Sequence, residues 1–453
     1  MYPSSHSDKA CLALLPNEIK TQIIEYVVMQ TEKRFFTDTH PPLPLSFVNR
    51  NFYELCSPFN WGELDLLCQC VPKLEECIQH CLPRQVNHVR SIVIGLHDCE
   101  EFPDQPLRRI LEMCTHLSKL SVRYETTSGH LDEHGNFIID PLHPMSRLLD
   151  PISQLSNLTY LTLRNHNTVK LTNRTGHAWN NWVFLHEEFV IKLIRNMRHL
   201  VFIHLERVEG GYENCDFPET DDFVPDPSLS PLAVHLASLP SLKFLYFTQM
   251  PSFDTSWSQI KWKGALEGFT LRKTFTVLRA VHAFCNMFAD SLIFISLYLS
   301  TLILENNRGP LTNALPSELD CFLFRLPNLK RLSICTELPY MILKLFRESH
   351  NIFRISLMNI PENRISVRDI KSIINRDTSP WRHLKSVLIH IEQGSFSFEE
   401  MIGLQHDGLE AGVRVECGTL KRRRQPFFEE DHFFSDGDAT TKSSSSSTIE
   451  KIH

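Results

Sequence analysis

The chain has 453 residues, a formal net charge of −7 and a hydrophobic fraction of 42%, which is enough for a large core. This balance lacks the basic face that general nucleic-acid binding requires, so we expect no such function. The longest apolar stretch, Ser291–Leu304, is interrupted by serines and falls short of the roughly 20 apolar residues of a membrane span. Because no secretory signal is visible either, we expect an intracellular protein, cytoplasmic or nuclear or both, without a membrane segment.

The first predicted module covers residues 12–66 and follows a polar segment, residues 1–11, that we expect to be disordered. Pro16 suits the start of a helix, and Glu18 suits the positive end of its dipole. A second helical pattern runs from Leu45 to Leu55, and Pro58 is expected to end it. The first helix is predicted from one apolar stripe, formed by Ile19, Ile23, Tyr26 and Val27.

The order of residue types in this module resembles that of an F-box. The matching residues are Leu15, Pro16, Glu18, Ile19, Ile23, Leu45, Val48, Arg50, Phe52, Tyr53, Pro58 and Trp61. The polar connection Thr31–Pro42 is longer than expected between the first two helices. F-box modules bind a Skp-family adaptor, which connects to a cullin scaffold. The resemblance implies that this contact, or the core that supports it, uses Leu15, Pro16, Ile19, Ile23, Leu45, Val48 and Trp61.

Such a module also has a physical reason to dock. About 50 residues make a marginal core, and apolar side chains that two or three short helices cannot hide form a binding surface. The alternative is an ordinary helical cap on the domain that follows.

The next segment carries a group of metal-ligand residue types, Cys68, Cys70, Cys77, Cys81, His80 and His88. Structural zinc sites repeat a paired C-x2-4-C spacing, whereas Cys77 and Cys81 lie one helical turn apart in the amphipathic pattern Lys73–Cys81. We therefore expect reduced core thiols and no metal site.

A recurring L-x-x-L-x-L pattern fills much of residues 67–419. The last three positions alternate, as in a strand with one buried face, and the first four copies lie about 40 residues apart. Helical patterns precede most copies, for example Glu187–Met197, Pro316–Leu326 and Val367–Ile374. The copies begin at Leu117, Leu158, Leu200, Leu242, Leu329, Ile352 and Leu384.

This region resembles a leucine-rich-repeat solenoid. Each helix–strand unit is too small to bury its apolar face alone, so stacked units share one core. Two departures are the long repeats and the insert Gly210–Pro231, which we expect to leave the solenoid as a loop, so a non-repeat α/β domain stays possible. The predicted fold is α/β: a short helical F-box module, then an irregular leucine-rich-repeat solenoid whose helix–strand units form a curved parallel sheet.

One repeat can be phased in two ways, with its anchor at Leu292 or at Leu299. The second phase matches Leu158–Asn165 even at the asparagine, Asn306, so the sequence favours a strand that starts at Leu299.

Residues flanking the buried strand positions should face the concave side of such a sheet. Aligned repeats place Tyr160, Phe202 and Phe244 side by side. Aromatic residues and arginine are enriched at binding hot spots, so this row is a candidate anchor for a partner protein; the alternative is that long inserts bury it. The substrate-binding residues proposed on this basis are Tyr160, Arg164, Phe202, His204, Phe244, Tyr246, Arg331 and Arg354.

Catalytic and cofactor motifs are missing from the sequence: it has no phosphate-binding glycine loop, no G-x-S-x-G and no H-E-x-x-H. We expect no catalytic residue and no cofactor. The tail, residues 420–453, joins the basic run Lys421–Arg424 to the acidic and aromatic run Phe427–Asp438 and a serine tract, and we expect it to be disordered.

These observations favour a substrate receptor of a Skp–cullin–F-box ubiquitin ligase that holds an unidentified protein on its concave face. The alternative is a leucine-rich-repeat interaction scaffold with no link to ubiquitin, and a weaker one is an enzyme with an unrecognised α/β domain.

Overall fold

A computed structural model describes most of the chain between Leu12 and Thr419. The described residues are 12–32, 43–66, 71–97, 104–125, 130–131, 137–138, 144–165, 168–172, 178–182, 185–209, 229–274, 276–298, 302–303, 320–336, 339–359, 365–391 and 396–419. The expected loop at Gly210–Pro231, the expected disordered segments 1–11 and 420–453, and Cys68 and Cys70 lie wholly or largely outside these residues.

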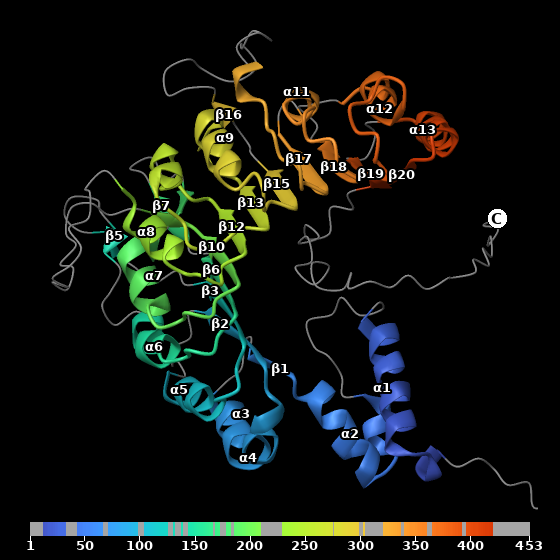
Figure 1. The fold of residues 1–453 in the computed structure, drawn as a ribbon. Helices are drawn as coiled ribbons and strands as arrows, with labels where there is room; N and C mark the ends of the chain where they lie inside the picture. Colours follow the sequence, from blue (N-terminus) through green and yellow to red (C-terminus); the bar gives the residue numbers. More distant parts are fainter. Residues whose placement is uncertain are drawn as a thin grey trace, which may run out of the picture.

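Within the described residues, twelve strands form one sheet in which every neighbouring pair is parallel and the strands follow chain order. Figure 1 shows the sheet lining the inside of an arc whose outside is covered by helices. This is the architecture of a leucine-rich-repeat-like solenoid. The strands are β1 (Glu63–Leu66), β2 (Ser91–His97), β3 (Lys119–Glu125), β6 (Tyr160–Asn165), β10 (Phe202–Glu206), β12 (Phe244–Thr248), β13 (Gly268–Arg272), β15 (Phe294–Tyr298), β17 (Arg331–Cys335), β18 (Arg354–Asn359), β19 (Ser386–Ile391) and β20 (Arg414–Thr419).

Helices of four to thirteen residues cover the outer face. Side-chain caps fix where several begin: Ser366 and Ser397 each form a capping box, and Ser230 accepts from the N–H of Ala233. The predicted helix Val367–Ile374 is confirmed, and the helix predicted at Glu187–Met197 is confirmed up to Ile194, where it ends. The outer helices are α3 (Val71–Glu76), α4 (Leu82–Gln85), α5 (Asp104–Met113), α6 (Pro144–Ser153), α7 (Glu187–Ile194), α8 (Pro231–Ala237), α9 (Leu278–Met287), α11 (Pro339–Lys344), α12 (Val367–Ile374) and α13 (Phe398–Glu410).

One continuous apolar core runs the length of the arc, from Leu64 in β1 to Val415 in β20. It lies between the sheet and the helices, because the alternate strand residues that match the repeat leucines all point there, as Leu245 and Phe247 do in β12. At the middle of the arc, aromatic rings from several repeats interlock around the fully buried Trp257. Shared burial of this kind is what makes short units stable only as a stack.

The N-terminal module has a separate small core of Ile24, Leu43, Phe52 and Cys56. It consists of α1 (Asn17–Glu32), the 3-10 turn η2 (Pro44–Phe47) and α2 (Arg50–Asn60). Of the polar connection Thr31–Pro42, only Thr31 and Glu32 belong to the described residues.

The second predicted helix of this module needs two corrections. The pattern from Leu45 to Leu55 is divided, because the side chain of Asn49 accepts from the N–H of Phe52 at 3.0 Å and starts a new helix there. Pro58 lies inside α2, which continues to Asn60, instead of ending it.

The sequence-based phase of the ambiguous repeat is wrong. The strand of the main sheet is β15, and its Phe294 pairs with Arg331 of β17, which sets the anchor at Leu292 and not at Leu299. Leu292, Ile295 and Leu297 are buried in the core. Leu302–Ile303 instead forms β16, which pairs with Thr276–Val277 in a separate two-stranded sheet. The anchor is Leu292 because the strand begins directly after the turn that ends α9, in which the N–H of Ser291 donates to the carbonyl oxygen of Phe288.

Strands β2, β13 and β20 had no counterpart among the predicted copies. The segment Leu266-Glu-Gly-Phe269-Thr-Leu271 does carry the pattern if phenylalanine stands for the second leucine. The spacing from Leu242 to Leu266 is shorter than the spacing of about 40 residues between the earlier copies. A search for evenly spaced copies therefore misses this repeat.

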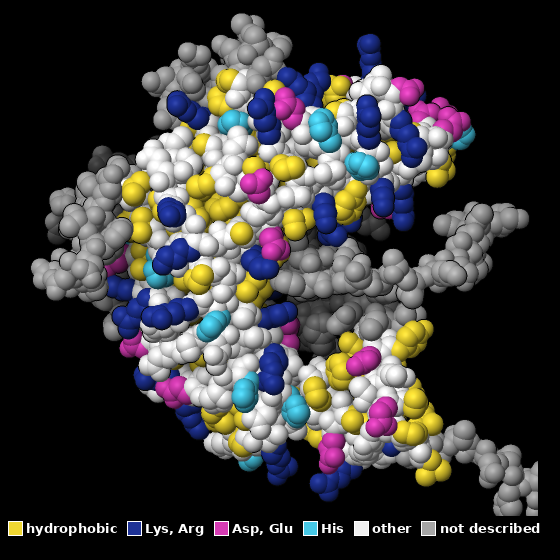
Figure 2. Space-filling view, in the orientation of Figure 1, with side chains coloured by type: hydrophobic (Ala, Val, Ile, Leu, Met, Phe, Trp, Pro, Cys, Tyr) yellow, Lys and Arg dark blue, Asp and Glu magenta, His cyan; other side chains and the backbone are white. Residues whose placement is uncertain are grey.

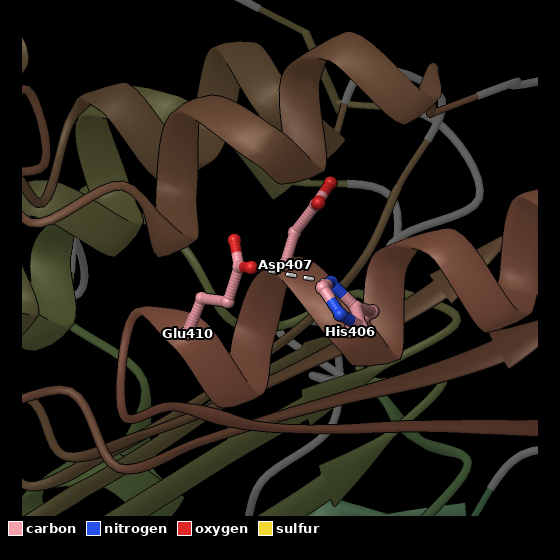
Figure 3. A group of neighbouring side chains, drawn as sticks. All are labelled: His406, Asp407 and Glu410. Carbon is pink, nitrogen blue, oxygen red and sulfur yellow. Dashed lines mark ion pairs between the residues drawn. The ribbon is translucent and has the colours of Figure 1, made fainter.

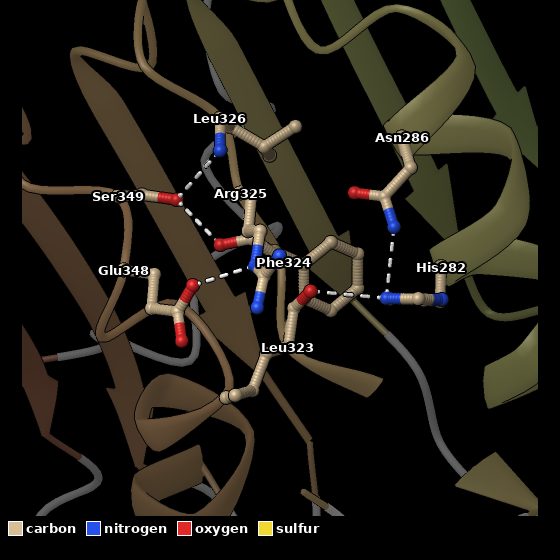
Figure 4. Close-up of polar contacts among 8 residues, drawn as sticks. All are labelled: His282, Asn286, Leu323, Phe324, Arg325, Leu326, Glu348 and Ser349. Carbon is tan, nitrogen blue, oxygen red and sulfur yellow. Dashed lines mark hydrogen bonds and ion pairs between the residues drawn. The ribbon is translucent and has the colours of Figure 1, made fainter. Parts of the chain in front are cut away.

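The predicted helix Pro316–Leu326 is also wrong in its described part. Asp320–Phe322 is a 3-10 turn, and residues 323–326 are irregular. Figure 4 shows how this segment is held: His282 contacts the carbonyl oxygen of Leu323, and Ser349 donates to that of Phe324 at 3.0 Å. Side chains and backbone of neighbouring repeats thus satisfy the polar groups that a helix would have paired internally.

Candidate functional site

Large apolar side chains are exposed on the N-terminal module. Of the twelve large hydrophobic residues that are exposed within the described part of the chain, eight belong to this module. Figure 2 shows hydrophobic side chains gathered over this lobe. We call them the module surface: Leu12, Leu14, Ile19, Tyr26, Phe47, Val48, Tyr53 and Phe59.

The residues that the resemblance implied for adaptor contact fall into three settings. Ile19 and Val48 belong to the module surface, and Pro16, whose carbonyl oxygen accepts from Lys20, is also exposed. Leu15 and Ile23 are half-buried. Leu45 packs against the small core, whereas Trp61 packs against the core of the solenoid.

Three prominent members of the module surface were not among those candidates: Leu14, Phe47 and Tyr26, which are 84%, 76% and 64% exposed. Helix α1 is apolar on two faces, and only the face with Ile24 enters the core. The sequence analysis had assigned Ile19 and Tyr26 to a single apolar stripe, and periodicity alone could not tell that these two side chains would stay exposed while Ile24 is buried.

The predicted side-by-side position of the concave aromatic residues is confirmed for the central strands. Strand register places Tyr160, Phe202 and Phe244 next to one another on β6, β10 and β12. The repeat phase that starts at Leu299 would place Thr301 next in this row. Gly268 of β13 and Phe294 of β15 follow instead, and Arg331 and Arg354 then continue the row. Phe202 and Tyr246 are buried yet stand outside the main core, because they point to the opposite face of the sheet.

The aromatic side chains of this row stack on each other. The rings of Tyr160 and Phe202 are parallel within 2° with centroids 4.0 Å apart, and Tyr246 lies 5.3 Å from Phe202. Phe202 and Tyr246 are only 2% and 4% exposed, whereas Tyr160 and Phe244 are half-buried. Partner contact would therefore fall first on Tyr160 and Phe244.

The polar candidates lie beside these rings. His204 contacts Thr248 Oγ1 at 3.2 Å and the ring of Tyr246 at 5.7 Å. Arg164 is half-buried on β6, in register with Arg123 of β3. Arg331 and Arg354 are direct neighbours on β17 and β18, which brings two cations together at one end of the row.

Three adjacent strands end in a left-handed residue that is not glycine: Arg207, Gln249 and Lys273, with φ of 56°, 53° and 50°. The N–H of each donates to the last residue of the following strand, at 2.9, 2.8 and 2.5 Å. Arg207 also donates through Nε to Gln249 Oε1 at 2.6 Å. These hydrogen bonds fix the ends of the three strands and bring Arg207, Arg272 and Lys273 close together. The sequence analysis did not single out this group of cations.

One group of possible metal ligands occurs in the described part of the chain, His406, Asp407 and Glu410 on α13 (Figure 3). Asp407 pairs with Lys371 of α12 at 2.9 Å, and His406 faces Glu410 at 3.6 Å. These contacts explain the cluster as a surface link between two helices.

Buried, unbridged thiols are found outside the group for which the sequence analysis expected them, at Cys56, Cys114, Cys285 and Cys335. Burial raises the pKa of Cys114 and of Cys335 to about 12, which makes both thiols poor nucleophiles. Cys77 and Cys81 are half-buried, and Cys321 is exposed.

None of the described helices combines the length and hydropathy that crossing a bilayer requires.

Comparison with known proteins gives little. No family model and no curated protein matches the chain. Among solved structures, an internalin from Listeria monocytogenes strain 4b F2365 aligns with 78% of this chain and 90% of its own, at 12% identity and a TM-score of 0.29. The twelve parallel strands and the continuous core define the solenoid.

Proposed function

We propose that this protein is a substrate receptor of a Skp–cullin–F-box ubiquitin ligase. The N-terminal module binds a Skp-family adaptor, which connects to a cullin scaffold, and the concave face of the solenoid binds the protein to be modified. The chain itself does no chemistry; it contributes proximity, by placing a lysine of its target near a conjugating enzyme held elsewhere in the complex.

The observation that carries this proposal is the module surface. A two-helix unit with its own small core leaves Leu14, Phe47 and Tyr26 largely exposed. Burying such side chains on a partner is favourable by roughly 25 cal/mol per Å² of apolar area, and a marginal module gains stability by doing so. The order of residues that resembles an F-box supplies the identity of the partner.

The concave row supports the second half of the proposal. Tyr160, Phe244, Arg331 and Arg354 are of the types that dominate binding energy at interfaces, and all are at least partly exposed. We propose that four further residues pack behind these contact residues and hold them in place: Arg164, Phe202, His204 and Tyr246.

A second candidate is an interaction scaffold that has no link to ubiquitin. It is favoured by the continuity of the module with the solenoid: Trp61 packs on the main core, and β1, which the sequence placed in the module, is the first strand of the sheet. In that case the module is a cap.

Capture of a Skp-family adaptor and a cullin by the full chain tests the proposal. The informative variant is Ile19→Asp with Val48→Asp, because both side chains are exposed and neither belongs to the small core. We expect the wild-type chain to capture both partners and the variant to lose at least about tenfold in affinity, as desolvated aspartates would face an apolar surface.

The matched control is Leu409→Asp on α13, an equally apolar, exposed position at the other end of the molecule. It should capture adaptor and cullin as well as the wild type does. If the folded wild-type chain captures neither partner, the ligase proposal is wrong and the scaffold reading replaces it.

A further inference from the structure

Between β3 and β18 the concave face is cationic, although the whole chain is acidic. At the two ends of the sheet the same positions also carry carboxylates, Glu63 and Asp65 in β1 and Glu416 in β20. In the three concave positions of the strands from β3 to β18, one carboxylate, Glu206, stands against six cations. The chain as a whole has a formal charge of −7, so this face is the exception. The six cations are Lys119, Arg123, Arg164, Arg272, Arg331 and Arg354.

Two of these cations lie over aromatic rings of the same surface. Lys119 lies 5.8 Å from the ring centroid of Tyr160, and Arg272 lies 5.5 Å from that of Tyr298. Arg207 and Lys273 add two positive charges at the strand ends. Burial, and then the charge of Arg272, lower the pKa of Lys273, and the carboxylate of Glu206 opposes this shift.

The chain carries a segment of opposite character. Residues 427–438 contain four phenylalanines and five carboxylates, and neither lysine nor arginine. The carboxylates are Glu429, Glu430, Asp431, Asp436 and Asp438. Charge and aromatic content thus both complement the concave face.

The chain between the last strand and the acidic segment is long enough to reach the concave face. The last strand ends at Thr419, and Glu429 is ten residue steps further along the chain, a reach of about 33 Å in extended chain. Strand β13 is five strand spacings from β20, about 24 Å, and β10 is seven spacings away, about 34 Å. Glu429 to Asp431 can therefore reach the cations between β18 and β10.

We propose that the acidic and aromatic segment Phe427–Asp438 docks on the concave face of its own solenoid. It occupies the surface assigned above to a target protein and competes with any acidic, aromatic segment of that target. This inference concerns the concave face alone and does not depend on adaptor binding.

Zero-length coupling of carboxylates to amines in the full chain tests the contact directly. Lys119 on the concave face and Lys273 at the strand end offer amines, whereas Lys371 and Lys385 are exposed and provide reference amines elsewhere. We expect cross-links within the monomer from Glu429, Glu430 or Asp431 to Lys273, and these should disappear in high salt because the attraction is screened. Absence of links to both Lys119 and Lys273, or links found only in a covalent dimer, would overturn the proposal.

Competition in trans provides the second measurement. The probe is a labelled peptide of residues 425–440, which omits the basic run. It should bind about tenfold more tightly to a full chain whose five tail carboxylates are changed to amides than to the wild type, because the resident segment no longer competes at high effective concentration. Equal binding to the two chains would count against docking.

Charge reversal then locates the site. Added to the amide variant, Arg331→Glu with Arg354→Glu should abolish peptide binding. The matched pair Arg368→Glu with Arg382→Glu lies on or near α12 and should leave it unchanged. An equal loss in both pairs would indicate nonspecific attraction and overturn the assignment. Neither measurement needs an adaptor, so a failed adaptor capture would leave this result standing.

Discussion

At the scale of single residues, His282 shows how one side chain joins two repeats. Its Nε2 lies 3.0 Å from the carbonyl oxygen of Leu323 and 2.8 Å from the side-chain nitrogen of Asn286 (Figure 4). A neutral imidazole nitrogen cannot donate and accept at once, so we infer that Nε2–H donates to Leu323 and that the Asn286 amide turns its oxygen toward the ring. Burial lowers the pKa of His282, and the bond to Leu323 opposes this only in part.

This environment predicts a pH dependence of stability. Because the folded-state pKa of His282 is lower than its unfolded value of about 6.5, its contribution is present above that value and is lost as the pH falls through the folded-state pKa. The melting temperature should fall between pH 7.5 and pH 5, and less steeply in His282→Gln.

Burial also lowers the pKa of His235 and of His390, so some decline should remain in the variant. The exposed His383→Gln serves as control and should keep the wild-type slope. Identical slopes in all three proteins would show that His282 does not contribute.

At the scale of elements, the contact between α13 and β20 closes the solenoid. Gly408 is buried there, and the N–H of Val413 donates to its carbonyl oxygen at 2.7 Å. A Cβ at Gly408 would lie 2.6 Å from the backbone oxygen of Val413, too close to be accommodated without a shift. Gly403, one and a half turns earlier in the same helix, has open space at this position.

The two glycines therefore predict opposite effects. Gly408→Ala should destabilise the protein by about 1–3 kcal/mol, because α13 must move away from β20. Gly403→Ala should stabilise it by about 0.5–1 kcal/mol, because alanine loses less backbone entropy in a helix. Denaturant unfolding of both variants measures the difference, and effects of the same sign would contradict the described packing.

At the scale of the whole molecule, two hydrophobic cores are built on one chain. The described links between them are few: Trp61 packs on the solenoid, and Gln85 donates to the hydroxyl of Tyr53 at 3.2 Å. A module with a small core and few links should open at a lower free energy than the solenoid does.

Amide hydrogen exchange distinguishes the two units. Phe52→Ala removes a fully buried ring from the small core and should cost about 3–5 kcal/mol there, raising exchange in α1 and α2 but not in β10 to β15. Trp257→Ala should do the reverse. Faster exchange across the whole chain in the Phe52 variant would mean that the molecule opens as one unit.

The sequence by itself determined the strand register in two parts of the sheet, from β3 to β12 and from β17 to β19. Leu161, Ile203 and Leu245 align because alternation along a strand is local and fixes which side chains enter the core. Tyr160, Phe202 and Phe244 become neighbours as a direct consequence of that register.

Only the tertiary structure decided the rest. The competing anchors Leu292 and Leu299 have similar local patterns, and the choice depends on where α9 ends. Residues 323–326 are irregular because His282 and Ser349 satisfy their backbone groups from other repeats. Helix α1 has two apolar faces, and which one stays exposed, with Tyr26 on it, depends on the position of α2. In each case the deciding contact is made by residues distant in sequence, which local periodicity does not contain.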